Sequence, residues 1–139
     1  MIKAELGRQL MIRVDDEVGT LAEVTSAISS YGINLIAMCA YSVDKTVAIM
    51  FVSEDNNAAK QILEKQGFEV QEQEIVLLSI DNKPGMLQVV TDKIAEAGID
   101  LRLLYGSVEE NAQICRVVLI SNNNLDVMMI IKSELERNG

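Results

Sequence analysis

The sequence predicts an α+β protein that contains two copies of one strand–helix–strand unit. Residues 14–35 and 80–101 align without a gap, 66 residues apart, and nine of the aligned positions are identical. Apolar residues recur at helical spacing in the first copy at Leu21, Val24 and Ile28, which indicates the buried face of a helix. The second copy repeats this spacing. A repeat of this length governs the fold prediction for the whole chain.

The first half predicts the order β-α-β-β-α-β. Leu10, Ile12 and Val14 alternate with less apolar residues, which is typical of a half-buried strand. Asn56 or Asn57 is expected to cap the second helix, because asparagine is a favoured N-cap. The elements that follow the first strand are a helix at 18–31, strands at 33–43 and 46–53, a helix ending at Gly67 and a strand at 68–73.

The second half repeats most of this order but lacks its last strand. It begins at about Ile75 after a short join, which gives domains at residues 1–73 and 74–139. The predicted elements after its first strand are the repeated helix, closed by Gly98, a strand at 99–108, a turn at 109–112, a strand at 114–121 and a helix at 124–135. The missing strand leaves one edge of the sheet open, and such an edge must be covered.

The helix at 124–135 carries apolar residues around most of its circumference. A helix of this kind is usually buried on more than one side. Either another part of the chain or a second subunit is expected to cover it. Together with the open sheet edge, this predicts a homo-oligomer, most simply a dimer.

Composition excludes several classes of function. A net charge of −9 disfavours nucleic-acid binding, and the absence of histidine removes the usual acid–base residue and most zinc sites. The acidic residues show neither metal-ligand spacing nor a catalytic pair, so we expect neither an enzyme nor a metal ion. The two cysteines, Cys39 and Cys115, lie in apolar runs and are expected to be reduced thiols. No apolar run could span a bilayer and no signal peptide is evident, so a cytoplasmic protein without a membrane partner is expected.

The repeated motif resembles the ACT domain, an amino-acid-sensing regulatory module. The family pattern is Asp-x-Pro-Gly-x-Leu, a helix, and then Gly-Ile-Asn-Leu. Residues 16–21 read Asp-Glu-Val-Gly-Thr-Leu and residues 82–87 read Asn-Lys-Pro-Gly-Met-Leu. The helices are followed by Gly-Ile-Asn-Leu at 32–35 and by Gly-Ile-Asp-Leu at 98–101. The resemblance covers nearly the whole chain as two tandem copies.

This resemblance implies two ferredoxin-like domains that pair side by side, with an antiparallel sheet and helices on one face. It also implies an amino-acid ligand between paired domains, held by the glycine turn and by the polar residue that opens the second strand. No cofactor is implied. The chain departs from the pattern at Val18, which replaces the proline, at Asp100, which replaces the asparagine, and at the absent last strand.

The site also has a physical rationale. A helix N-terminus offers N–H groups to a ligand carboxylate, and a glycine lets the ligand approach the backbone. Asparagine and aspartate oxygens suit the ligand ammonium. The same residues could instead cap helices or satisfy turn backbones. The predicted ligand-binding residues are Asp16, Gly19, Thr20, Leu21, Asn34, Asn82, Lys83, Pro84, Gly85, Met86, Leu87 and Asp100.

Two functions are compatible with the sequence. The first is a regulatory protein without its own catalytic domain that binds a free amino acid or a similar zwitterion. The second is a regulatory or structural subunit that docks onto a separate metabolic enzyme and binds no ligand. For the first function, pairing the Gly85 turn and Asn82 with Asn34 gives a neutral site, whereas pairing Asp16 with Asp100 places two carboxylates together. The neutral set is expected to form the stronger site.

Overall fold

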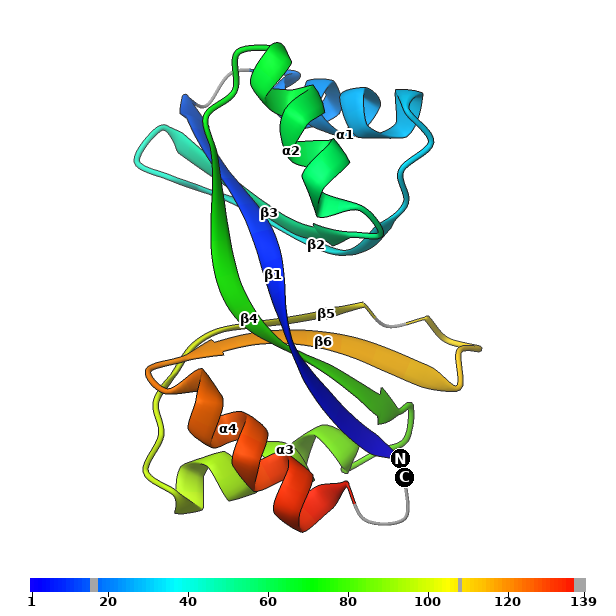
Figure 1. The fold of residues 1–139 in the computed structure, drawn as a ribbon, viewed down its shortest axis with the longest axis vertical. Helices are drawn as coiled ribbons and strands as arrows, with labels where there is room; N and C mark the ends of the chain where they lie inside the picture. Colours follow the sequence, from blue (N-terminus) through cyan, green and yellow to red (C-terminus); the bar gives the residue numbers. More distant parts are fainter. Residues whose placement is uncertain (16–17, 108, 137–139) are drawn as a thin grey trace. The chain divides into compact units, whose positions relative to one another are not determined.

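The computed structural model describes residues 1–15, 18–107 and 109–136. Within these ranges it contains six strands and four α-helices (Figure 1), and the predicted α+β class is confirmed. The elements are β1 (Ile2–Asp15), α1 (Thr20–Ser30), β2 (Leu35–Val43), β3 (Thr46–Ser53), α2 (Asn56–Lys65), β4 (Val70–Asp81), α3 (Met86–Glu96), β5 (Leu101–Ser107), β6 (Ile114–Ser121), α4 (Asn124–Ile130) and a π-helical turn (Ile131–Leu135).

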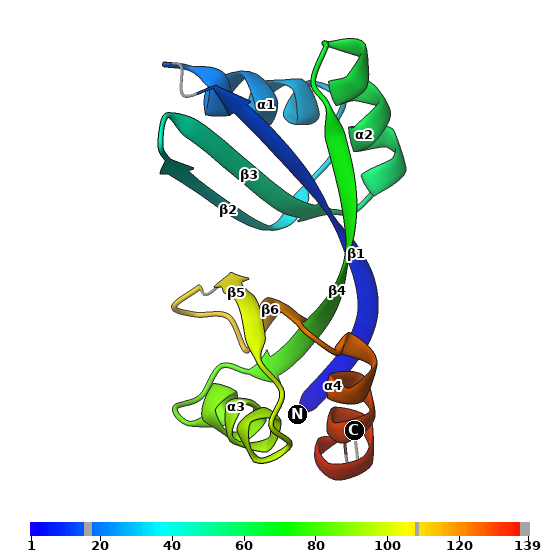
Figure 2. The same cartoon turned by 90° about the vertical axis from the view of Figure 1, so that its left-hand side faces the viewer.

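The chain divides into two compact units. We call Arg8–Gln73 the first unit, and Met1–Gly7 with Glu74–Gly139 the second unit. Hydrogen-bonded strands follow the order β2-β3-β1-β4-β6-β5, so β1 and β4 each contribute to both units. The first unit thus has the order β2-β3-β1-β4 and the second β5-β6-β4-β1, which is the same ferredoxin-like order twice. In each unit both helices cover one face of the sheet (Figures 1 and 2).

The strand that the second half lacks is supplied by the beginning of the chain. Ile2 and Ala4 are 8% and 1% exposed and belong to the core of the second unit. The Asp81 N–H donates to the Met1 carbonyl at 3.0 Å, which ties the start of β1 to the end of β4. The open edge expected from the sequence is therefore filled by the chain itself, because β1 extends eight residues before Leu10, where the sequence analysis placed its first strand residue.

The domain limits expected from the repeat differ from these units at one end. Both divide the chain between Gln73 and Glu74, but the units group Met1–Gly7 with the second half. No join separates the halves, because β4 runs unbroken from Val70 to Asp81. One strand thus ends the first copy of the fold and begins the second.

Each unit has its own apolar core, formed by the helix face that the periodicity predicts. Val24 and Ile28 are buried in the first unit, and Val90 and Ile94 in the second. Leu21, which belongs to the same predicted stripe and lies in the first turn of α1, is 42% exposed.

The structure can be compared with two local predictions, the turn between β2 and β3 and the N-cap of α2. The predicted turn between β2 and β3 forms at Asp44 and Lys45, both with positive φ (49° and 66°), as a type I′ hairpin requires. The predicted cap of α2 was wrong. Asp55 is the N-cap, and its side chain accepts a hydrogen bond from the Ala58 N–H at 3.1 Å. Asn56 is instead the first residue of the helix.

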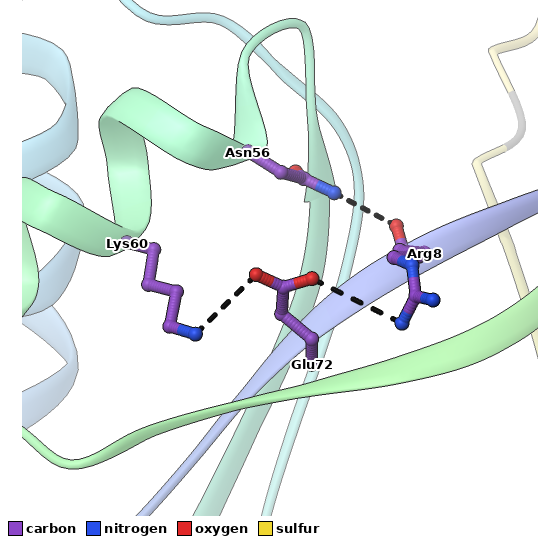
Figure 3. Close-up of polar contacts among 4 residues, drawn as sticks. All are labelled: Arg8, Asn56, Lys60 and Glu72. Carbon is purple, nitrogen blue, oxygen red and sulfur yellow. Dashed lines mark hydrogen bonds and ion pairs between the residues drawn. The ribbon is translucent and has the colours of Figure 1, made fainter.

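Asn56 fastens α2 to two strands of the first unit. Its Oδ1 accepts from the Ser53 N–H at 3.0 Å and from the Ser53 hydroxyl at 2.8 Å, and its Nδ2 donates to the Arg8 carbonyl at 2.8 Å. Figure 3 shows the last of these bonds beside Glu72, whose carboxylate pairs with Lys60 at 3.4 Å and with Arg8 at 3.9 Å.

The second unit repeats this arrangement at Asn124. Its Oδ1 accepts from the Ser121 N–H at 2.8 Å, and its Nδ2 lies 3.4 Å from the Glu74 carbonyl. Arg8 and Glu74 are 66 residues apart, the same offset as the glycine motifs. The structural repeat therefore begins at these two residues. Arg8 is the first residue of the first unit, and Glu74 is the first residue of the longer segment of the second unit.

The last helix continues from α4 through a π-helical turn at Ile131–Leu135. Val127, Met128 and Ile131 are buried in the second core, whereas Leu125 and Met129 are each 61% exposed. After the turn, Glu136 accepts a hydrogen bond from the Ala4 N–H at 2.6 Å and so covers part of the edge of β1. None of the helices in the described ranges is long and apolar enough to span a membrane.

Candidate functional site

The turn before α1 places a glycine at the N-cap of the helix. Gly19 has φ 93°, in the left-handed region that glycine favours, and it has no side chain that could cap the helix. The first N–H groups of a helix have no partner within it and carry the positive end of its dipole. An anion is therefore the natural partner for this end of α1.

An open hollow of about 660 Å³ lies at this helix end. It brings together three predicted site residues, Gly19, Thr20 and Leu21, with residues of α1, β2 and β3 that the sequence analysis missed. The missed residues are Ala22 and Thr25 of α1, Ala40, Tyr41 and Ser42 of β2, and Val47 of β3. The residues of β2 and β3 carry no signal in the sequence, because they reach this helix end only through the packing of the hairpin beside α1.

The equivalent turn before α3 has the same backbone but different surroundings. Gly85 is the N-cap with φ 87°, again without a side-chain cap. Lys83, Pro84 and Leu87 are exposed. Met86, at the position of Thr20, packs against the core of the second unit. The predicted residues around Gly85 therefore lie together on one turn.

Asn82 is engaged within the second unit. Its Nδ2 donates to the Glu109 carbonyl at 3.2 Å and to the Ala112 carbonyl at 3.0 Å, and its backbone N–H donates to the Gln113 carbonyl at 2.9 Å. Both amide hydrogens thus hold the turn between β5 and β6. Capping of α3 by Asn82, the alternative role considered from the sequence, is not observed.

Asn34 and Asp100 occupy equivalent places ahead of β2 and β5. Both side chains are exposed, and their carbonyls accept from the N–H groups of Glu54 (3.0 Å) and Asn122 (3.1 Å). Asn34 follows the C-terminal end of α1, whereas Gly19 precedes its N-terminal end. An 11-residue helix is roughly 16 Å long, so these two residues do not meet within one unit.

Near the Gly85 turn, two charged groups of the second unit form an ion pair. The Met1 ammonium forms an ion pair with Asp81 and thereby lowers the pKa of that carboxyl. Asp16, the remaining predicted site residue, lies outside the described residues. In the part of the chain that is described, no group of three or more acidic or cysteine side chains could hold a metal ion.

The comparison with protein families matches part of the chain. Residues 8–67 match the ACT domain model. This span lies inside the first unit and contains the Gly19 turn, α1 and the hollow. It covers less than half of the chain, so a second ACT domain in the second unit stays a proposal. None of the curated proteins matches the sequence.

Solved structures match nearly the whole chain. Protein BT0572 from Bacteroides thetaiotaomicron is 25% identical with a TM-score of 0.84, over 94% of this chain and 89% of that one. The regulatory subunit of aspartate kinase from Thermus thermophilus is 15% identical with a TM-score of 0.66, over 97% of each chain. The corresponding subunit from Thermus flavus is 16% identical with a TM-score of 0.60, over 95% of each chain. The two kinase subunits therefore share the fold of this chain.

Proposed function

We propose that this protein is a regulatory protein, without catalytic activity of its own, that binds a free amino acid at the Gly19 turn. The observation that carries the proposal is the hollow at the N-terminus of α1, beside the Gly19 turn. The ligand carboxylate accepts hydrogen bonds from the first N–H groups of α1. The hydroxyl oxygens of Thr25, Tyr41 and Ser42 line the same hollow and suit an ammonium group.

The Gly85 turn is the weaker candidate in this proposal, although the neutral pair Asn82 and Asn34 favours it on charge alone. The Gly19 turn is preferred because the hollow lined by hydroxyl side chains lies there, whereas the Nδ2 of Asn82 holds the hairpin turn and Asn82 offers only its Oδ1 to a ligand ammonium. Residues from a second domain, such as Asn34 or Asp100, would complete either site if ACT-type domains pair around the ligand.

Regulation then acts on a separate protein. The two Thermus structures are regulatory subunits of aspartate kinase, so a metabolic enzyme of amino-acid biosynthesis is the class of partner that we propose. The same similarity supports the second function, in which the chain is a docking subunit that binds no ligand. The proposed assembly is a homodimer, and a monomeric mass in light scattering would refute it.

Two matched aspartate substitutions test the ligand site. Ala22 lines the hollow and is exposed, and Gln88 stands at the equivalent position of α3. An acidic residue in the first turn suits the helix dipole, so both variants are expected to fold. Only Ala22→Asp places a carboxylate where the ligand carboxylate binds.

The measurement is the melting temperature with each of the twenty amino acids. At a ligand concentration about a hundred times the dissociation constant, stability rises by ~2.7 kcal/mol. For a chain of 139 residues, whose unfolding entropy is about 0.29 kcal/mol/K, that is a shift of roughly 9 °C. Ala22→Asp should abolish the shift and Gln88→Asp should retain it. The opposite result would move the site to the Gly85 turn. A panel without any shift, together with capture of an enzyme, would support the docking subunit.

A further inference from the structure

A second groove lies on the helical side of the first unit, between α1 and the end of α2. It has a volume of about 560 Å³ and shares no residue with the hollow at Gly19. The side chains around it include one carboxylate, two aromatic rings and three uncharged polar side chains. They are Glu23, Ser26, Ser30, Tyr31, Gln66 and Phe68.

The corresponding place in the second unit is occupied by a lysine of the chain itself. Lys93 stands 66 residues after Ala27, which also lines the groove. The Lys93 Nζ lies 3.6 Å from Glu96 and 3.4 Å from Glu134, so it bridges α3 to the π-helical turn after α4. These carboxylates raise its pKa, and an ammonium group is therefore held between the two helices.

The first unit lacks both the lysine and its carboxylate partners. By the offsets of the repeat, Glu96 corresponds to Ser30 and Glu134 to Gln66. Ala27 is 5% exposed and too short to fill the space. A new carboxylate, Glu23, stands where α3 has Val89. The space that holds an ammonium in one unit is thus open and lined by an acid in the other.

The lining of the groove suits a cation on an aliphatic stem. None of the side chains that line it is basic. Glu23 supplies a negative charge, and the rings of Tyr31 and Phe68 offer faces that attract cations. Ser30 donates its hydroxyl hydrogen to the Ser26 carbonyl at 2.7 Å, which leaves its oxygen as an acceptor. The net charge of −9 favours the approach of a positively charged partner.

We propose that this groove receives a lysine side chain from a partner protein, in the place that Lys93 fills in the second unit. The groove is open and Tyr31 is 67% exposed. Small-molecule sites usually enclose most of their ligand, whereas a side chain presented by a protein needs only a surface groove. The proposal concerns a different surface from the amino-acid site and does not depend on it.

The test compares two peptides by amide chemical shifts in nuclear magnetic resonance. The probe is N-acetyl-Gly-Lys-Gly-amide, and the control is the same peptide with an acetylated lysine Nζ. The lysine peptide at millimolar concentration should shift the amide signals of Glu23, Tyr31 and Gln66, and the acetylated peptide should not. Pentylamine is the third arm. Tighter binding of pentylamine than of the lysine peptide would overturn the assignment to a protein side chain.

Two variants locate the binding. Glu23→Gln should weaken it by about three- to fivefold, the size of an exposed ion pair. Ala27→Lys should abolish it by placing an ammonium of the chain itself in the groove, as in the second unit. Equal shifts with the acetylated peptide, no shifts with either peptide, or unchanged affinity in both variants would overturn the proposal. Because Glu23 is exposed, its replacement keeps the test valid if Ala27→Lys fails to fold.

Discussion

The two units share their backbone and differ in what fills the space around it. Gly19 and Gly85 have nearly the same φ, 93° and 87°, and each is the N-cap of its helix. Asn56 and Asn124 make the same bonds to a preceding serine and to a central strand. The repeat has therefore kept the features that fix the fold.

The side chains around those features differ between the two units. Those of the second unit make contacts within the unit, whereas those of the first unit line open surfaces. In the second unit Met86 packs on the core, Asn82 holds a hairpin turn and Lys93 bridges two helices. The first unit has Thr20 and Ala27 at the positions of Met86 and Lys93, and each lines an open surface. This difference fits the proposed function, in which the first unit binds and the second unit stabilises the protein.

The largest expected effect tests whether the second unit depends on the beginning of the chain. Removal of residues 1–7 deletes its edge strand and exposes the core around Val76 and Leu78. The loss of Ile2 alone should cost about 2–5 kcal/mol, the range for a buried isoleucine, and the backbone bonds add to this. Hydrogen exchange should show lost protection from residue 74 onward and a smaller change within 8–73.

A point substitution controls for the truncation. Lys3→Ala changes an exposed residue of the same strand and should leave the exchange pattern unchanged. If the truncated protein kept full protection in β6 and α4, the first seven residues would be an accessory to the second unit and not part of its sheet.

The next effect compares the two asparagines. Asn56→Ala leaves the Ser53 N–H and the Arg8 carbonyl without this partner, which should cost about 1–3 kcal/mol. Asn124→Ala should cost less, because both acceptors of its Nδ2 are distant, the Glu74 carbonyl at 3.4 Å and the Glu74 carboxylate at 3.3 Å, whereas Asn56 bonds the Arg8 carbonyl at 2.8 Å. Urea denaturation measures both, with the exposed Asn57→Ala as control. A larger cost at Asn124 would contradict this order.

These asparagines also mark the limit of what the sequence could predict. The glycine turns, both buried helix faces and the strands at 46–53 and 114–121 followed from periodicity and turn chemistry, because those signals are local. The role of Asn56 did not, since an asparagine before a helix is more often its cap. Its true partners, Ser53 and Arg8, are defined only once β1 lies beside the start of α2.

The first strand shows the same limit. Ile2 and Ala4 form too short an alternation to predict a strand, and nothing local indicates that they complete a sheet with residues 74 to 81. Only the absence of a strand after the last helix pointed to a missing partner. For the candidate site, the sequence identified Gly19 and its neighbours, but the contribution of Tyr41 and Ser42 depended on the tertiary packing of β2.

A smaller effect separates fold from binding at the two glycines. An added Cβ at Gly19 or Gly85 would meet no atom of the described residues within 4 Å, so backbone strain is the expected cost of alanine. A left-handed conformation costs about 1–2 kcal/mol for a residue with a Cβ, and both variants should lose this amount. Thermal denaturation checks the strain, and amino-acid titration checks binding. Only Gly19→Ala is expected to weaken binding. Equal loss of affinity in both would indicate a site at each turn.

The smallest expected effect concerns Lys93, whose ion pairs exist only in the second unit. The hydrogen bond and charge of Glu134, with the charge of Glu96, raise the pKa of Lys93 above its usual value of 10.5. A raised pKa contributes stability that is fully present below 10.5 and is lost as the pH rises through the folded-state value. The wild type should therefore melt slightly above Lys93→Met at pH 8 to 10, and this difference should shrink above pH 10.5.

Lys3→Met, at an exposed lysine of β1, serves as control because Lys3 makes no ion pair among those of the described residues. High salt should reduce the difference in the same way, since it screens exposed charges. A difference in melting temperature that persisted unchanged above pH 11 and in high salt would mean that the aliphatic stem of Lys93 packs against the helices and that its charge contributes nothing. That result would also weaken the case for an ammonium in the equivalent groove at Ala27.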